Sequence, residues 1–420
     1  MNERLLQFIW QFQYYQNINL FSTNNEQLQI ISPGVLNKNQ GPDFLNAKIN
    51  IANTLFVGSV EIHVNASEWE RHKHQTDNNY SNVILHVVWQ EDKTLNVAFP
   101  TLVLQHLVSS ILLKKYKALM DAPFFIPCAS QINLVNSFTL ASFKDRLIIE
   151  RLQEKAADVQ KILAQNNNHW EDTFWQLLAK NFGIKVNSQA FQSMAKSINL
   201  TILAKHKNQL HQLEALMLGQ CGLLENDVKD DYAIMLQKEF QFLKQKYKLV
   251  QNTIPTHFLR MRPANFPTIR LAQLAALIFN SNHLFSKIKE ADHVTQVEQM
   301  FNVMANDYWH YHYNFDVPTP YKPKNLGKQM IQNIIINTII PVLYAYGWYN
   351  NNELYKLKAL QWIECLLPEK NNITTGFQQL EIKNKSAYDS QALIQLKNKY
   401  CNLKRCLECA IGNQILKLRE

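Results

Sequence analysis

The stretch GSVEIHV, residues 58–64, decides how the first part of this chain folds. Its valine and isoleucine residues alternate with polar ones, so they are expected on one side of a β-strand, with Glu61 and His63 together on the other. The β-branched residues favour a strand over a helix. An acidic side chain and a histidine inside an apolar strand need a partner or a cation, because burying either alone is costly. The stretch therefore predicts a buried strand that carries a site.

Short apolar segments of the same kind surround this strand over about residues 1–110. They are five to eight residues long, rich in Val, Ile, Leu and Phe, and separated by Gly, Asn, Asp and Pro, which is typical of strands. The segments are LQIISPG, DFLNAKINIA, VILHVVW and LNVAFPTLVL. Before them, Leu5, Ile9 and Phe12 share one helical face, so the region is expected to open with a short amphipathic helix.

The remainder of the chain has the 3.6-residue apolar period of helices, as in residues 143–164 and 270–279. Only 10 of the 420 residues are glycine, which excludes a largely β protein with many tight hairpins. We therefore expect an α+β protein. Its sheet domain is predicted at residues 1–125 and an all-α region, with a C-terminal cysteine cluster, at residues 126–420.

Acidic residues near the strand indicate a cation site. Asp43 follows Pro42 at the start of an earlier strand, and its carboxylate is expected alongside that of Glu61. Two carboxylates and the backbone carbonyl of Ile62 would offer an oxygen-rich site for Mg²⁺ or Mn²⁺. The alternatives are a turn-forming or capping role for Asp43 and a plain Glu–His pair in a wet groove.

This arrangement resembles the PD-(D/E)XK phosphodiesterase superfamily, which has the restriction-endonuclease-like fold. There a Pro-Asp pair starts one strand and an acidic-x-Lys triplet lies on the next. Pro42-Asp43 and Glu61-Ile62-His63 match that pattern, except that His63 stands in place of Lys. The resemblance covers the first 110 residues and implies a mixed sheet flanked by helices, with a divalent metal at the site. Asp43 and Glu61 would then hold the ion, and His63 would orient or deprotonate a water.

A group of histidines follows the strand within residues 68–77. His72, His74 and Asp77 are candidates to bind one ion, with a solvated basic loop as the alternative. The run from His63 through Trp69 to His74 resembles that of very short patch repair endonucleases, which implies a structural zinc; where that family has Cys, Asp77 would substitute. His86, inside a further strand, is a candidate neighbour of the same site or a core histidine.

Nearly the whole chain also resembles an uncharacterised bacterial family, the domain of unknown function numbered 2851. The segments that carry this resemblance are GPDFLNAKI, GSVEIHV, WERHKHQTDNNYSNVILHVVW, NFPTIRLAQLA and CLECAIGN. It implies no activity.

A second metal site is predicted near the end of the chain. Cys401, Cys406 and Cys409 lie within nine residues beside basic neighbours, which favours thiolates. A metal would need a fourth ligand, for which Cys128 is a candidate. The alternative is a set of buried thiols beside a turn. With only six cysteines in 420 residues, a disulfide framework is excluded.

Basic residues point to nucleic acid as the partner. The net charge is +9, and Arg260, Arg262 and Arg270 are candidates to clamp phosphates, with interhelix contacts as the alternative. We expect DNA rather than RNA.

The chain is expected to be cytoplasmic and not to bind a membrane. Glu3 and Arg4 are unlike a secretory signal, and Asn337 and Pro341 interrupt the longest apolar run, at residues 334–349.

Three functions remain open from the sequence. The first is a metal-dependent nuclease that uses Asp43, Glu61 and His63. The second is an inactive scaffold with a nuclease-like fold that binds nucleic acid or protein, favoured by the replacement of Lys by His63. The third is a protein in which His72, His74 and Asp77 hold zinc for structural purposes only.

Overall fold

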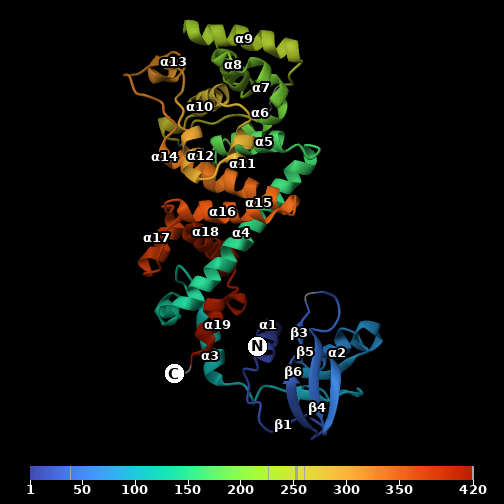
Figure 1. The fold of residues 1–420 in the computed structure, drawn as a ribbon. Coiled ribbons are helices and arrows are strands. Elements are labelled where there is room, and N and C mark those ends of the chain that lie inside the picture. The colour runs from blue at the N-terminus through green and yellow to red at the C-terminus, as the bar shows by residue number, and fades with distance from the viewer. Residues whose placement is uncertain (38, 226, 251–253, 260, 419–420) are drawn as a thin grey trace. The chain divides into compact units, whose positions relative to one another are not determined.

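The computed structural model describes all residues except 38, 226, 251–253, 260 and 419–420. It divides into two compact units, each described here by itself (Figure 1). The first contains residues 1–143 and 397–420, and the second contains residues 144–396. The C-terminal cysteines thus lie in the compact unit that holds the sheet, whereas the predicted division at 125/126 assigned them to the helical region.

The first unit is built on a mixed seven-stranded sheet in a nearly closed, barrel-like arrangement. Its strands are β1 (Leu20–Phe21), β2 (Gln27–Ser32), β3 (Val35–Leu36), β4 (Phe44–Ile51), β5 (Thr54–Asn65), β6 (Val83–Gln90) and β7 (Thr101–Val103). The order is β1-β2-β4-β5-β6-β7, with β3 also paired to β4. Pairing is antiparallel from β1 to β5 and parallel from β5 to β7.

The central strand β5 is buried on both faces over the stretch that carries the site. Residues 54–57 are exposed and residues 58–63 are buried. The parallel register sets Glu61 opposite His86, and the antiparallel register sets Phe44 opposite Val60. A register shift between Phe44 and Ala47 marks an irregularity at the start of β4, where Asn46 has a positive φ of 59°. The start of β4 and the buried part of β5 therefore lie side by side.

Short helices complete the first unit. They are α1 (Glu3–Gln11), α2 (Glu68–Arg71), η1 (His74–Thr76), η2 (Asn78–Tyr80), α3 (Ser110–Asp121), η3 (Ala129–Leu134), η6 (Leu396–Cys401), η7 (Cys406–Glu408) and α19 (Ala410–Lys417). The Asn2 side chain caps α1 by accepting a hydrogen bond from the Leu5 amide. The helix packs against β5 and buries Leu5, Leu6, Phe8, Ile9 and Trp10.

The second unit is mostly helical. Its helices are α4 (Ser137–Gln165, whose first turns belong to the first unit), α5 (Trp170–Phe182), α6 (Ser188–Ser197), α7 (Leu200–His206), α8 (Leu210–Gln220), α9 (Asp231–Tyr247), η4 (Pro263–Asn265), α10 (Pro267–Asn280), α11 (Leu284–Glu290), α12 (Val294–Met300), α13 (Asp307–His310), α14 (Lys328–Ile334), η5 (Ile335–Ile339), α15 (Ile340–Tyr349), α16 (Glu353–Cys365), α17 (Asn372–Gln379) and α18 (Ala387–Gln395). A small hairpin of β8 (His312–Asn314) and β9 (Val317–Pro318) interrupts them.

The longest apolar run of the sequence belongs to a helix inside this unit. Helices α14, η5 and α15 follow one another without a break from Lys328 to Tyr349. In the part of the chain that the structure describes, this 22-residue helix alone is long and apolar enough to cross a membrane, and 78% of its most apolar window is buried inside the protein. Asn337 and Pro341, which interrupt the apolar run in the sequence, both lie within this helix.

The structure confirms the predicted α+β class, the early mixed sheet and the helical remainder. The opening helix and the strands at residues 27–32, 44–51, 54–65 and 83–90 are where the patterns placed them. Residues 95–100, predicted as part of a strand, are irregular, and only Thr101–Val103 form β7.

Candidate metal centre

The site lies where the start of β4 meets the buried half of β5. Asp43 directly precedes β4, and Glu61 and His63 point to the same face of β5, as alternation along a strand requires. His86 on β6 is the parallel partner of Glu61. Glu61 is 5% exposed, His63 1% and His86 0%, so three ionisable side chains are removed from water on adjacent strands.

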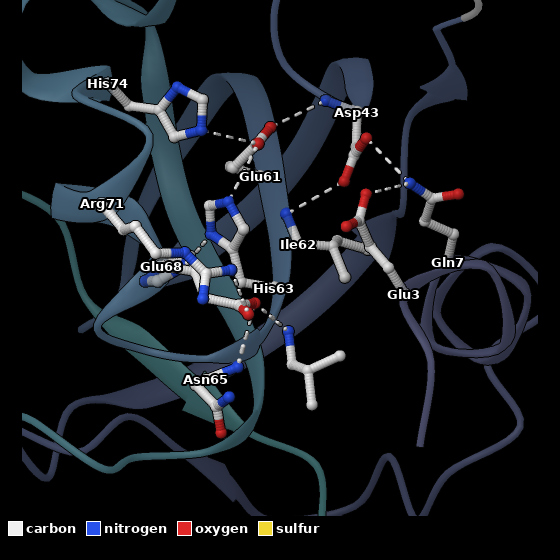
Figure 2. Close-up of polar contacts among 12 residues, drawn as sticks. Glu3, Gln7, Asp43, Glu61, Ile62, His63, Asn65, Glu68, Arg71 and His74 are labelled. Carbon is white, nitrogen blue, oxygen red and sulfur yellow. Dashed lines mark hydrogen bonds and ion pairs between the residues drawn. The ribbon is translucent and has the colours of Figure 1, made fainter.

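Asp43 and Glu61 are joined by reciprocal contacts to each other's backbone (Figure 2). The Asp43 amide donates to Glu61 Oε2 (3.0 Å), and the amide of Ile62 donates to Asp43 Oδ2 (3.2 Å). From α1, the Gln7 amide group donates to Asp43 Oδ1 (2.9 Å) and to Glu3 Oε1 (3.2 Å). These bonds fix both carboxylates and leave Glu61 Oε1 directed at the histidines.

Three histidines gather on the other side of Glu61. One ligand atom from each of His63, His72 and His74 lies within 4.8 Å of the others. Glu61 Oε1 is 3.5 Å from Nε2 of both His63 and His74, and Figure 2 shows both contacts as dashed lines to the carboxylate. His74 Nε2 makes no hydrogen bond although it is buried. Three imidazoles thus lie together, and a carboxylate oxygen of Glu61 lies next to two of them, His63 and His74.

The pKa values of both carboxyl groups are raised. Burial is the largest cause for each, and it raises the pKa of Asp43 to about 7 and that of Glu61 to about 9. The charge of Asp43 adds to the rise at Glu61, and the charge of Glu3 adds to the rise at both. Acids that are desolvated next to other acids favour a cation as their neighbour, because a positive charge removes the cost of ionising them.

The histidines are shifted in the opposite direction. Burial, followed by repulsion from the other imidazoles, lowers the pKa of His63 to about 2 and that of His86 to about 3, and burial lowers the pKa of His74. Neutral imidazole is the form that ligates metals. The group is therefore suited to receive a metal ion and poorly suited to hold protons.

His86 on β6 forms a hydrogen bond with the ring of His63. Nδ1 of His63 and Nε2 of His86 are 2.9 Å apart, and one of them must carry the proton of this hydrogen bond. If His63 donates through Nδ1, its Nε2 lone pair faces Glu61 and the other rings, which is the tautomer of a metal ligand. Nδ1 of His86 is buried without a hydrogen bond.

Aromatic rings close the site beside His74. The ring of Tyr80 lies 3.9 Å from that of His74, and Trp69 contacts both His74 and His86. Burial and the nearby carboxylates raise the pKa of Tyr80 to about 12. His72, in contrast, is exposed, so the histidine group has an open side toward solvent.

Of the residues predicted for this site, the structure brings together Asp43, Glu61, His63, His72, His74 and His86. Asp77 is not part of the group of ligand atoms. Its carboxylate caps η2, accepting from the Asn79 amide (2.9 Å), and acts on His74 only through its charge. The predicted trio of His72, His74 and Asp77 is therefore replaced by His63, His72 and His74.

Sequence reasoning missed three polar residues of the site. Glu3 and Gln7 are one helical turn apart on α1, and both face Asp43. Glu68 of α2 accepts hydrogen bonds from the amides of Val64 (3.0 Å) and Asn65 (3.3 Å), and so fixes the end of β5. The available signal was an acid and an amide four residues apart, and so on one face of α1.

The predicted phosphate clamp belongs to the second unit. Arg260 is outside the described residues, and Arg262 is exposed just before η4. Arg270 is 8% exposed and donates to Gln273 (2.9 Å) and to Asn265, and burial lowers its pKa to about 10. Its guanidinium is thus engaged by side chains of α10 itself and of η4.

Comparison with known proteins identifies a family. Residues 3–372 match the model of the family described as "Protein of unknown function (DUF2851)". No curated protein and no solved structure shows a significant match.

Proposed function

The chain belongs to the DUF2851 family, and we propose that it is a metal-dependent phosphodiesterase that hydrolyses nucleic acid. The observation that carries this proposal is the group formed by His63, His72 and His74, with Glu61 Oε1 3.5 Å from Nε2 of both His63 and His74. Asp43 stands beside them with a carboxyl group that burial keeps from ionising easily. A divalent ion is the ligand that would satisfy these groups together.

The donor set favours a metal that accepts imidazole nitrogen. Three histidines and one carboxylate oxygen suit Zn²⁺, Mn²⁺ or a similar transition metal better than Mg²⁺, which prefers oxygen ligands alone. The exposed position of His72 leaves room for a substrate or water, whereas structural zinc sites are closed. These features support a catalytic centre over a purely structural one.

The residues of the site would have different roles in the proposed reaction. Glu61, His63, His72 and His74 would hold the ion, and His86 would fix the tautomer of His63. An ion held there would supply Lewis-acid chemistry, because it offsets charge on a phosphoryl oxygen and makes water more acidic. The low pKa of His63 supports a role as ligand rather than the proton-accepting role predicted from the sequence. Asp43, with a pKa raised to about 7, is the better candidate to accept a proton from the attacking water.

The proposed substrate class rests on two supports. Pro42-Asp43 opens β4 and Glu61-Ile62-His63 lies on the next strand, which is the placement of the PD-(D/E)XK motif in the restriction-endonuclease-like fold. The net charge of +9 favours a polyanion. We take DNA as the first substrate to test and RNA as the second.

The direct test is cleavage by the full chain after metal removal. Protein stripped with a chelator is incubated with plasmid, single-stranded DNA or RNA, and Mn²⁺, Zn²⁺ or Mg²⁺ is then added. We expect metal-dependent cleavage that is lost in Asp43→Asn and Glu61→Gln. The matched control is Asp158→Asn, which removes a carboxylate that is 73% exposed and pairs only with Lys161 on the surface. Failure to cleave with all three metals, or unchanged cleavage by the two site variants, would refute the proposal.

An inactive scaffold is the second candidate, and the replacement of the motif's Lys by His63 favours it. A lysine would offer a fixed positive charge to the substrate, and a neutral imidazole does not. This candidate predicts that the chain binds nucleic acid, or a protein partner, without cleaving it. Binding of a labelled oligonucleotide that persists in Asp43→Asn and Glu61→Gln, with no product in any metal, would establish it.

A further inference from the structure

Four of the six cysteines lie in two segments of the first unit that are far apart in sequence. Cys128 directly precedes η3, and Cys401, Cys406 and Cys409 lie between the end of η6 and the start of α19. Cys128, Cys406 and Cys409 are buried and Cys401 is half-buried. Helix α19 packs on η3 and on α3, so the two segments are neighbours in space.

Side chains from the C-terminal segment hold the backbone on both sides of Cys128. Lys397 Nζ donates to the carbonyl of Phe125 (2.6 Å), and Lys404 Nζ donates to the carbonyl of Met120. On the far side, the Asn136 amide donates to Gln414 Oε1 (3.3 Å). The two segments are thus bonded to each other before and after the cysteine.

The backbone around Cys406 and Cys409 is equally constrained. The Cys409 amide donates to the carbonyl of Cys406 (3.4 Å), which folds the two cysteines into one turn. Gly412 packs so closely on the carbonyl of Cys406 that a Cβ atom there would collide with it. The backbone at Gly412 therefore lies in close contact with the turn that carries Cys406 and Cys409.

The four thiols are close enough to influence one another. Burial is the largest cause that raises the pKa of Cys128 and of Cys406 to about 12, and it raises the pKa of Cys401 further. In addition, every pair among the four repels as thiolates, since Cys409 and Cys406 act on Cys128, all three others act on Cys401, and Cys409 acts on Cys406. Lys397 and Lys404 favour the thiolates at Cys401 and Cys406.

We propose that Cys128, Cys401, Cys406 and Cys409 ligate a metal centre through four thiolates. The centre joins the segment after α3 to the C-terminal segment, which are about 270 residues apart in sequence. On binding, each thiol gives up its proton, and the metal replaces the protons as the partner of the sulfurs. Four buried sulfurs from two segments are the donor set of a structural zinc or an iron–sulfur cluster.

The spacing between the sulfur atoms distinguishes a zinc ion from an iron–sulfur cluster. A single zinc ion draws its sulfurs to within about 4 Å of one another, because each Zn–S bond is about 2.3 Å long. Within the described residues, the group whose ligand atoms lie within 4.8 Å of one another is the histidine group and not the cysteines. A cluster binds its cysteines through separate irons and accepts wider spacing. The experiment therefore measures zinc and iron separately.

The test measures metal content in the full chain purified without oxygen. It is done in a His74→Ala background, so that zinc at the histidine group does not contribute. We expect either about one zinc per chain or iron with a matching amount of acid-labile sulfide and visible charge-transfer absorption. Cys128→Ser and Cys406→Ser should each remove most of that metal. The controls are Cys221→Ser, a buried thiol, and Cys365→Ser, an exposed one, and both should leave the metal content unchanged.

A second measurement covers variants that fail to fold. Titration of the folded His74→Ala protein with an organic mercurial should release the metal as the buried thiols react, and a metallochromic dye reports the release. Anaerobic protein that contains neither zinc nor iron would overturn the proposal. So would metal that remains in Cys128→Ser and Cys406→Ser, or that the mercurial does not release. None of these outcomes bears on the nuclease activity proposed above.

Discussion

The backbone amide of Asp43 donates to the carboxylate of Glu61, while the carboxylate of Asp43 accepts from the amide that follows Glu61. These two hydrogen bonds join the start of β4 to β5, so the acids that form the site also connect the two strands. The bonds orient the carboxylates, but each acid is still buried beside the charge of the other. Holding two such groups is costly in the absence of a cation, which suggests that function rather than stability maintains them.

Glu61→Gln should make the metal-free protein more stable while it abolishes activity. The glutamine carbonyl oxygen can accept from the Asp43 amide as Glu61 does, and its amide group can donate to the free Nε2 of His74. With a pKa raised to about 9, Glu61 must take up a proton when the chain folds at neutral pH, and glutamine avoids that cost. The substitution should therefore raise the free energy of unfolding at neutral pH by about 1–3 kcal/mol. Urea unfolding of chelator-treated wild type and variant measures this.

Glu61→Ala serves as the control for that prediction. It removes the same ionisable group but also leaves the Asp43 amide without its acceptor, so it should gain less stability than Glu61→Gln. A Glu61→Gln protein that is less stable than wild type would show that the carboxylate serves the fold and not the site.

His72→Ala should weaken metal binding without affecting the metal-free fold. His72 is exposed, so its loss leaves no cavity, yet it removes one of three imidazoles from the ligand group. A metal at 100 times its dissociation constant stabilises the folded state by about 2.7 kcal/mol. We expect Zn²⁺ or Mn²⁺ to raise the melting temperature of wild type and to do so much less in His72→Ala.

The comparison for that prediction is His106→Ala, which removes another exposed histidine of the same unit. It should respond to metal as wild type does. Equal metal-induced stabilisation of His72→Ala and wild type would exclude His72 as a ligand.

The sequence was sufficient for those parts of the site that depend on a single strand. Alternation in β5 sets Glu61 and His63 on one face whatever surrounds them, and the β-branched neighbours predict the burial. The histidine group was anticipated in the right segment, but with Asp77 in place of His63. His63 joins because a turn with Lys73 in the left-handed region brings His74 back over β5, and no periodic pattern reports such a turn.

Contacts between distant segments escaped prediction for the same reason. Glu3 and Gln7 reach Asp43 only because α1 packs on β5, which is a tertiary choice. In the second unit, the apolar period predicts helix, but it does not report the π-helix that carries Asn337 before α15 begins at Ile340. Pro341 sits in the first turn of α15, where a missing amide proton is tolerated.

Gly58→Ala should destabilise the sheet and weaken the site with it. A Cβ atom at this position would lie 2.7 Å from the carbonyl oxygen of Asn82 and would collide with the side chain of Ile84. That carbonyl accepts from the Ser59 amide (2.8 Å), so it cannot retreat without breaking the pairing of β5 with β6. We expect a loss of about 1–3 kcal/mol in the free energy of unfolding, measured with urea. Gly327→Ala, where no atom lies within 4 Å of the added Cβ, should cost far less.

Glu214 should make the stability of the helical unit depend on pH. It is fully buried in α8, where Tyr232 donates to its carboxylate (2.5 Å) and Trp309 does so through Nε1 (3.2 Å). Burial is the largest cause of its shift and raises the pKa from 4.5 to about 7 in spite of these bonds. Below 4.5 the carboxyl is protonated in the folded and the unfolded chain alike. As the pH rises from 4.5 to about 7, the unfolded chain loses the proton first, so stability falls across that window.

The loss should amount to roughly 3 kcal/mol, because each pKa unit corresponds to about 1.4 kcal/mol. Glu214→Gln carries no ionisable group and should flatten the dependence, so that it gains stability relative to wild type as the pH rises through the window. Urea unfolding followed by tryptophan fluorescence, at pH values below and above it, measures the slope. Asp158→Asn, an exposed carboxylate of the same unit, should keep the wild-type slope. If Glu214→Gln and wild type lose stability in parallel, the carboxyl is ionised in the folded protein across this range, and the two donors around it, Tyr232 and Trp309, outweigh its burial.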